Sequence, residues 1–147
     1  MKTLIKSSVL IFLVALLSAC KSGMVISHGS SFGHCRGFCN KELKLTEKGA
    51  KFSAWENGNA PVTKTLEVTD RGTDFKRVAG LLNAEVFKKL ELRYGCPDCA
   101  DGGSEWIEVK NGLNTKRILF EYGNPPEELK ALNDQLRSIQ AFYDKSK

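Results

Sequence analysis

The chemistry open to this chain depends first on its five cysteines. Cys20 stands alone, whereas the others form two close pairs, Cys35 with Cys39 and Cys96 with Cys99. Each pair can close its own small loop as a disulfide, or the pairs can cross-link the two loops. Alternatively, the four thiolates can bind a structural zinc ion or act as reactive thiols. The spacing alone leaves these arrangements open.

The second pair has the two-residue spacing of thiol oxidoreductases. Such sites place their first cysteine at a helix start, whose positive end stabilises the thiolate. Here Ala100-Asp101-Gly102-Gly103 follows, which does not predict a helix. The negative charges of Asp98 and Asp101 would also disfavour a thiolate. We therefore do not expect redox catalysis at Cys96 and Cys99.

No other pattern predicts a reaction. Residues 29–33 match the Gly-x-Ser-x-Gly pattern of serine hydrolases, but that mechanism needs a following helix and a later histidine. The last histidine is His34, and no helical pattern follows it. We expect His28 and His34 to be solvated. Only His34, beside Cys35, could substitute for a cysteine in a zinc site. The sequence thus predicts no catalytic residues and no cofactor.

The N-terminal residues predict export. Lys2 and Lys6 precede an apolar run over residues 9–17, which is shorter than the roughly 20 residues of a membrane-spanning helix. This is the pattern of a secretory signal peptide. Leu17-Ser18-Ala19-Cys20 resembles the lipobox of bacterial lipoproteins. The resemblance implies cleavage after residue 19, a diacylglycerol on the Cys20 thiol and acylation of the new amino group.

This anchor also determines the expected compartment. Two or more acyl chains hold a protein stably on a membrane, whereas one holds it only marginally. Lys21 after the cysteine resembles the outer-membrane address of enteric lipoproteins, so we expect the domain on the periplasmic face of the outer membrane. Because that compartment permits disulfides, they are favoured over zinc. Of the two pairings, we prefer the local bridges, Cys35–Cys39 and Cys96–Cys99.

Size and charge limit the partners. Removal of residues 1–19 from the 147 leaves 128, which suffices for one domain. The formal charge falls from +5 to +3, since the signal holds two lysines and no acidic residue. A charge this mild, with no basic run, gives little support for nucleic-acid binding. The expected partners are the membrane, through the anchor, and an unidentified protein or small molecule.

Hydrophobic periodicity predicts an α+β domain over residues 34–145. Residues 20–33, rich in Ser and Gly, are expected to be the lipidated N-terminus and a flexible tether, in which 24–27 can form a short strand. The domain is predicted to be an antiparallel sheet of about five strands with helices on one face. The expected strands are 41–46, 50–55, 62–69, 105–110 and 115–122, and the expected short helices are 73–82 and 84–89.

The last helix has the clearest pattern. Asn124 is its expected N-cap and Pro125 its first residue. Five apolar residues then fall on one helical face, which predicts packing against the sheet: Leu129, Leu132, Leu136, Ile139 and Phe142.

Two segments of the domain carry a second resemblance. Phe32-Gly33-His34-Cys35-Arg36-Gly37-Phe38-Cys39, before a strand, and Asn124-Pro125-Pro126-Glu127-Glu128-Leu129, opening the last helix, resemble a family of small bacterial lipoproteins and exported domains of unknown function. That family has Cys-x-Gly-x-Cys-Pro where this chain has Asn40 in place of the proline. The resemblance covers about residues 31–143 and implies a fold and an address, without an activity.

The sequence therefore predicts a non-enzymatic, lipid-anchored binding or interaction module that faces the periplasm. The alternative is a metal-binding or thiol-active lipoprotein that uses Cys35, Cys39, Cys96 and Cys99.

Overall fold

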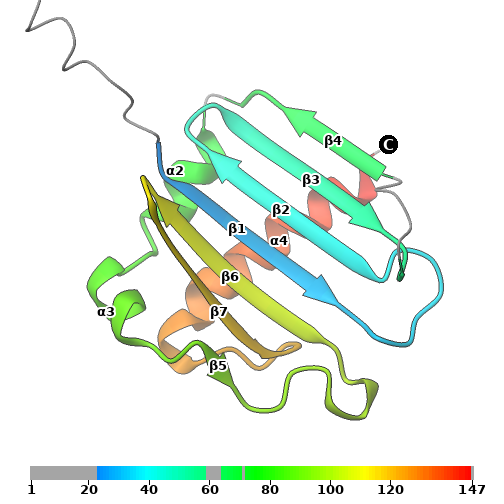
Figure 1. Ribbon diagram of the computed structural model, residues 1–147. Coiled ribbons are helices and arrows are strands. Elements are labelled where there is room, and N and C mark those ends of the chain that lie inside the picture. Colours follow the sequence, from blue (N-terminus) through cyan, green and yellow to red (C-terminus); the bar gives the residue numbers. More distant parts are fainter. Residues whose placement is uncertain (1–22, 59–63, 71, 147) are drawn as a thin grey trace, which may run out of the picture.

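A computed structural model of the chain describes residues 23–58, 64–70 and 72–146 (Figure 1). The first four strands are β1 (Val25–Ser31), β2 (Asn40–Thr46), β3 (Gly49–Trp55) and β4 (Lys64–Val68). Two short helices follow, α2 (Thr73–Ala79) and α3 (Ala84–Lys89), and then the two-residue strand β5 (Arg93–Tyr94) and the 3-10 turn η1 (Cys99–Asp101). The hairpin β6 (Ser104–Asn111) and β7 (Asn114–Glu121) precedes η2 (Glu127–Leu129) and α4 (Lys130–Lys145).

The strands form one seven-stranded sheet with the order β4-β3-β2-β1-β6-β7-β5. All neighbours are antiparallel except β5 and β7. The first strand of the described chain therefore lies in the middle of the sheet, between β2 and β6. The structure confirms the mixed α+β fold with its C-terminal helix and short middle helices, but the sheet has more strands than predicted.

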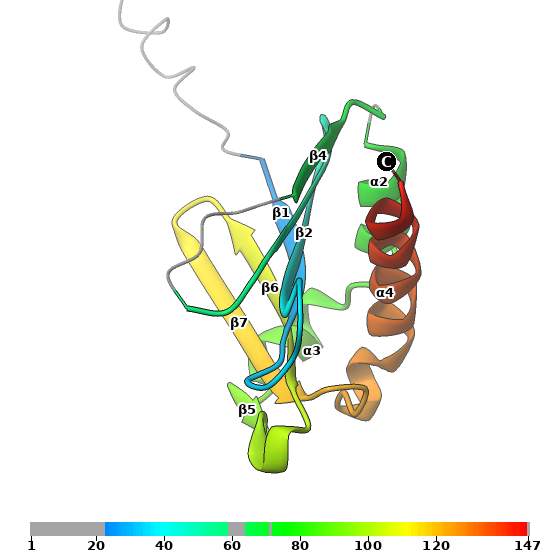
Figure 2. The ribbon, with the colours of Figure 1, turned by 90° about the vertical axis from the view of Figure 1, so that its right-hand side faces the viewer.

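Helices α2 and α4 cover one face of the sheet (Figure 2). Among the described residues, no helix covers the opposite face. Helix α4 buries Leu132, Leu136 and Ile139 against the strands, and each such side chain contributes about 1.5–3 kcal/mol when fully buried. Packing of this apolar face, more than intrinsic helix propensity, therefore stabilises α4. No helix of the described chain is long and apolar enough to span a bilayer.

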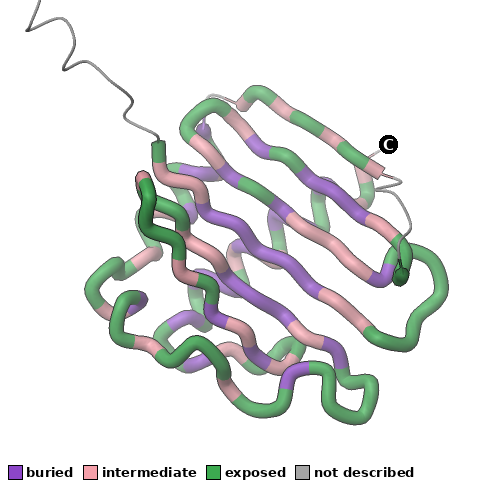
Figure 3. Tube along the Cα trace, viewed as in Figure 1, coloured by how far each residue is buried: buried purple, intermediate pink, exposed green. Residues whose placement is uncertain are grey.

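The strand register arranges the helix-facing side chains in rows across the sheet. The first row is apolar from β4 to β6, where it joins Val68, Ala50, Leu45, Ile26 and Val109, and it ends at Lys116 of β7. The second row contains five apolar side chains and, in its middle, His28: Leu66, Phe52, Leu43, His28, Ile107 and Ile118. Figure 3 shows this central part of the sheet as the most continuously buried part of the chain. The hydrophobic core lies between these two rows and the helices.

The open face has its own close contact at the centre of the sheet. Gly29 and Trp106 are register partners in β1 and β6, and the indole lies over the glycine, where a Cβ would overlap the ring. The indole is 8% exposed although no helix covers it. The guanidinium of Arg117 stacks over it, 5.1 Å from the ring centroid. Gly29 is thus required by the close approach of a large ring.

Residues 25–31 correct the prediction of a flexible tether over 20–33. They form β1, whose five inner residues are all buried. Their sequence, Val-Ile-Ser-His-Gly-Ser-Ser, has almost no hydrophobic alternation, and it is buried because neighbouring strands satisfy its backbone and larger side chains cover it. Residues 21 and 22 lie outside the described part of the chain, as do the predicted signal peptide and Cys20.

The asparagines that precede the helices have different roles. Asn83 is the N-cap of α3, since its Oδ1 accepts a hydrogen bond from the Val86 N–H at 3.2 Å. The predicted N-cap Asn124 is wrong, because the chain first makes the 3-10 turn η2 and then α4. The Asn124 amide instead donates to Glu121.

Substitution of Gly29 tests the central strand. We expect Gly29→Ala to lower the free energy of unfolding by about 1–3 kcal/mol, because the added methyl displaces the Trp106 indole. Gly23→Ala is the matched control, since a Cβ there meets nothing within 4 Å. Urea titrations of the two variants measure the difference. Equal stabilities would contradict the placement of Trp106 over β1.

Candidate functional site

The third helix-facing row of the sheet is polar on β1, β2 and β6, where His28 is the one polar residue of the first two rows. Ser30 of β1 lies between its register partners Lys41 of β2 and Glu105 of β6. From Lys41 the row continues through Ala54 of β3 to Lys64 of β4, at the edge of the sheet. The C-terminal half of α4 passes over this row. The hydrophobic core therefore ends here, and polar groups from strands and helix face one another.

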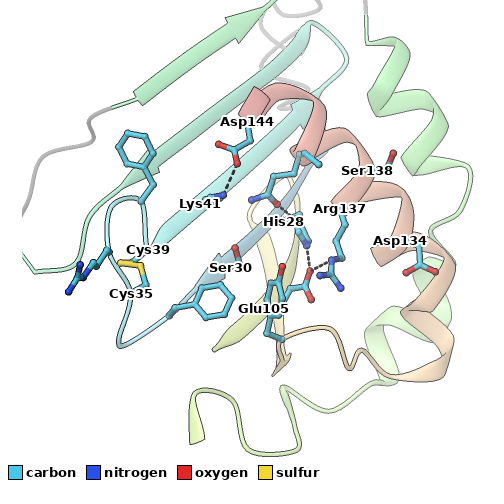
Figure 4. A pocket seen from close by; sticks show the side chains of 16 residues that line it. His28, Ser30, Cys35, Cys39, Lys41, Glu105, Asp134, Arg137, Ser138 and Asp144 are labelled. Carbon is cyan, nitrogen blue, oxygen red and sulfur yellow. Dashed lines mark hydrogen bonds and ion pairs between the residues drawn. A yellow bond between two sulfur atoms is a disulfide. The ribbon is translucent and has the colours of Figure 1, made fainter. Parts of the chain in front are cut away.

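An open cavity of about 730 Å³ lies over this row (Figure 4). Its floor comes from β1, β2 and β6, one wall comes from α4, and the opposite wall comes from the loop between β1 and β2. The lining residues are His28, Ser30, Lys41 and Glu105 from the strands, Phe32, Cys35, Arg36, Phe38 and Cys39 from the loop, Tyr122 after β7, and Asp134, Arg137, Ser138, Gln140, Ala141 and Asp144 from α4.

A buried histidine and carboxylate form the base of the cavity. The Nε2 of His28 donates to Glu105 Oε1 at 2.7 Å, and Nδ1 donates to Gln140 Oε1. His28 is 2% exposed and Glu105 is fully buried. Both ring nitrogens are therefore used within the protein, and the imidazole links β1, β6 and α4. This arrangement leaves no ring nitrogen to take a proton from a substrate.

Glu105 is held in its charged form. Burial raises the pKa of its carboxyl, but the hydrogen bond and charge of His28, the Gly123 N–H and the Arg137 guanidinium together lower that pKa below its ordinary value of 4.5. The Gly123 N–H donates to Oε2 at 2.9 Å, and Arg137 Nε lies 3.6 Å from Oε1. A buried carboxylate without such partners would be strongly destabilising.

The same arginine connects the buried pair to the cavity wall. The guanidinium of Arg137 stacks over Tyr122, 4.6 Å from the ring centroid, and the Tyr122 ring lies 4.7 Å from the Phe32 ring. Arg137 thus contacts Glu105 and an aromatic face at once, which restricts its side chain. Phe32 and Tyr122 provide an apolar surface beside the polar floor.

Lysines and an aspartate lie at the other end of the row. Lys41 Nζ lies 2.6 Å from Asp144 Oδ2, and Lys64 Nζ lies 3.9 Å from Oδ1 of the same carboxylate. Lys64 also donates to the backbone carbonyl of Asp144. Asp144 is in the last turn of α4, where cations complement the negative end of the helix dipole. One carboxylate here faces two ammonium groups.

The structure pairs each cysteine with its close neighbour, as predicted. Cys35 and Cys39 lie at disulfide-bonding distance with a Cα–Cα separation of 5.6 Å, and Cys96 and Cys99 do so with 5.5 Å. The first bridge lines the cavity, whereas the second does not. Among the described residues, no group of three or more His, Cys, Asp or Glu side chains is placed to hold a metal ion.

The two disulfide loops lie against each other without a covalent link. His34 Nδ1 lies 2.7 Å from Asp101 Oδ1, and the Gly33 N–H donates to Asp98 at 3.2 Å. His34 is exposed, as expected. Asp98, Ala100 and Asp101 have positive φ angles of 64°, 50° and 59°, which non-glycine residues rarely adopt. These contacts position the loop that forms the cavity wall.

The sequence pattern did not identify the residues at the centre of this site. The prediction of a solvated His28 is wrong, because the residue is in the middle of the core. The Gly-x-Ser-x-Gly match is in β1 and the turn after it, with no helix following. The alternation of the strands could have identified two of the site residues. Lys41 is two residues before Leu43, and Glu105 is two residues before Ile107. Because Leu43 and Ile107 face the helices, Lys41 and Glu105 must face them as well.

No protein-family model and no curated protein matches the chain.

The charge of Glu105 predicts a pH-dependent stability. Its folded pKa is lowered, so its contribution is present above the unfolded pKa and is lost as the pH falls from about 5 through the folded pKa. Glu105→Gln should lower the free energy of unfolding by about 3 kcal/mol at neutral pH and flatten this acid dependence. Urea titrations across the acid range measure both effects.

Glu108→Gln is the matched control on the same strand, since Glu108 is on the open face and pairs with Arg117 at 2.9 Å. It should change stability by well under 1 kcal/mol. If the loss of stability at acid pH persists in the Glu105→Gln variant, a group other than Glu105 causes it, and the prediction is contradicted.

Proposed function

We propose that the protein is a non-enzymatic binding module, attached to a membrane by lipid on Cys20, and that the cavity over Ser30, Lys41 and Glu105 is its ligand site. The supporting observation is that buried polar groups border an open cavity beside an aromatic wall. Ligand sites in proteins are typically concave, with apolar walls and a few polar groups that fix orientation. The volume of about 730 Å³ is in the usual range for small-molecule sites.

The chemistry of the cavity favours binding over catalysis. A general base needs a free acceptor at an accessible position. The His28 ring uses both nitrogens internally, and Glu105 accepts from His28 and Gly123 and faces Arg137. The disulfide-paired cysteines offer no thiolate. The titratable groups at the base of the cavity thus stabilise the fold and shape the site.

The position of β1 in the sequence indicates how the domain would be oriented on the membrane. Only residues 21–24 separate Cys20 from Val25 at the start of β1, and these five residue steps span at most about 18 Å. Ser30 lies five residues further along the strand, about 17 Å from Val25. A lipid on Cys20 would therefore hold the domain close to the bilayer, with the cavity at the end of β1 remote from the lipid. On the periplasmic face of an outer membrane, the ligand would reach it from the periplasm.

The anchor is tested with the whole chain expressed in a Gram-negative bacterium. We expect mass spectrometry of the mature N-terminus to find Cys20 with a diacylglycerol and an acyl chain, and the protein to sediment with outer membranes. Cys20→Ser should prevent the modification, whereas the double variant Cys35→Ser and Cys39→Ser should leave it unchanged. An unmodified Cys20 in the wild-type protein would contradict the anchor.

The ligand site is tested by NMR titration of the mature protein with benzoate, benzamide, benzylamine and benzyl alcohol. These probes share one ring and differ in their polar group. At least one should shift the amide resonances of β1 and α4 residues that line the cavity. Ala141→Trp should abolish these shifts, because Ala141 is an exposed helix residue on the cavity wall, and the indole would fill the space without disturbing the core.

A matched control is Ala131→Trp, which places the same side chain on an exposed position of α4 that does not line the cavity. It should leave the shifts unchanged. Absence of binding by all four probes, or binding that survives Ala141→Trp, would contradict the proposed site.

A further inference from the structure

Two nearly buried polar side chains in the cavity have unused hydrogen-bonding capacity. Ser30 and Gln140 are each 6% exposed, and both line the cavity. Within the described residues, neither the Ser30 hydroxyl nor the Gln140 amide nitrogen has a hydrogen-bond partner. A buried polar group left without a partner is destabilising. Partners for both groups must therefore come from solvent or from a ligand in the cavity.

The orientation of Gln140 determines what the ligand must provide. Its Oε1 accepts the Nδ1–H of His28. The amide nitrogen is on the opposite side of the same planar group, so its two hydrogens are available to the cavity. Figure 4 shows Ser30 on the cavity floor near Lys41, whose ammonium group faces Asp144. The floor is rich in donors, and a ligand must bring acceptor oxygens.

The charges around the floor favour an anionic acceptor. Asp144 is shared by Lys41 and Lys64, and Glu105 is shared by His28 and Arg137. Apart from the histidine, the charged side chains that line the cavity are three cations, Arg36, Lys41 and Arg137, and three acids, Glu105, Asp134 and Asp144. Within the described residues, Arg36 has no ion-pair partner. The acidic groups are already paired, so they present little free negative charge to a ligand. The remaining acid of the wall, Asp134, pairs with Lys130 at 2.9 Å.

The wall next to this floor is aromatic. The rings of Phe32 and Tyr122 are in contact, and the cavity borders both. An apolar group of a ligand can pack there while its charged end reaches the floor. Inorganic anions lack such a group.

We propose that the cavity binds a small organic carboxylate. Its oxygens accept hydrogen bonds from the Gln140 amide nitrogen and the Ser30 hydroxyl, with the Lys41 ammonium as the nearby positive charge. Its apolar part packs on Phe32 and Tyr122. This inference rests on the proposed binding function of the cavity and adds the chemical class of the ligand.

Isothermal titration calorimetry of the mature protein with benzoate and benzamide tests this class, because the two probes differ only in the carboxylate. Benzoate should bind at least about tenfold more tightly, as expected for charge-assisted hydrogen bonds. Gln140→Glu keeps the acceptor for His28 but replaces the amide donor by a negative charge. It should weaken benzoate binding by about tenfold or more, with little effect on benzamide.

Two controls separate the site from general effects. Gln135→Glu makes the same charge change on the same helix outside this cavity and should leave benzoate binding unchanged. If Gln140→Glu does not fold, Lys41→Met takes its place, with Lys64→Met as control, since both lysines face Asp144 but only Lys41 lines the cavity. Lys41→Met should weaken benzoate binding more than Lys64→Met does.

The outcomes distinguish this inference from the function on which it rests. Equal or tighter binding of benzamide or benzylamine, abolished by Ala141→Trp, would overturn the carboxylate class and leave the cavity as a ligand site. Benzoate binding that is insensitive to Gln140→Glu, or equal in Lys41→Met and Lys64→Met, would also overturn it. Failure of all probes to bind would overturn both proposals.

Discussion

The structure depends on one buried interaction, the contact of His28 with Glu105 in the middle of the sheet. A carboxylate with no exposed surface must be compensated inside the protein, and His28, Arg137 and the Gly123 N–H provide that compensation. These partners come from β1, α4 and the turn after β7. The need to neutralise Glu105 therefore links the central strands to the C-terminal helix, at the point where the hydrophobic core ends.

The cavity is a consequence of the same constraint. The first two rows of helix-facing side chains are apolar apart from His28 and, on β7, Lys116, and they pack closely under the helices. In the third row, Ser30, Lys41 and Glu105 cannot form a dry core, so α4 covers them with polar residues and leaves an open space. The Gln140 amide has a double role, because its oxygen holds His28 and its nitrogen remains available to the cavity. Fold stability and the proposed ligand recognition thus share one side chain.

The sequence predicted the elements whose hydrophobic period is strong. The alternation of Leu43 and Leu45 in β2, and of Phe120 and Ile118 in β7, indicated strands. The stripe of α4 indicated a core-facing helix, but its last predicted residue, Phe142, is 68% exposed. The cysteine spacings left several arrangements open, and the structure confirms the local pairs that were preferred among them. The sheet was predicted too small because β1 has polar residues on both faces and β5 has only two residues. No periodicity rule identifies β1 as a strand, because its burial depends on Trp106 of β6 and on the pairing of His28 with Glu105, 77 residues away.

The site was harder to predict because its residues come from distant segments. His28, Glu105 and Gln140 meet only when β1 lies between β2 and β6 with α4 above it, and that strand order is not local information. The most direct test of the central claim is a crystal structure of the protein with benzoate. We predict that the carboxylate lies against the Gln140 amide nitrogen and the Ser30 hydroxyl, with the ring on Phe32 and Tyr122. Benzoate bound outside this cavity, or with its carboxylate directed away from Gln140, would contradict the account.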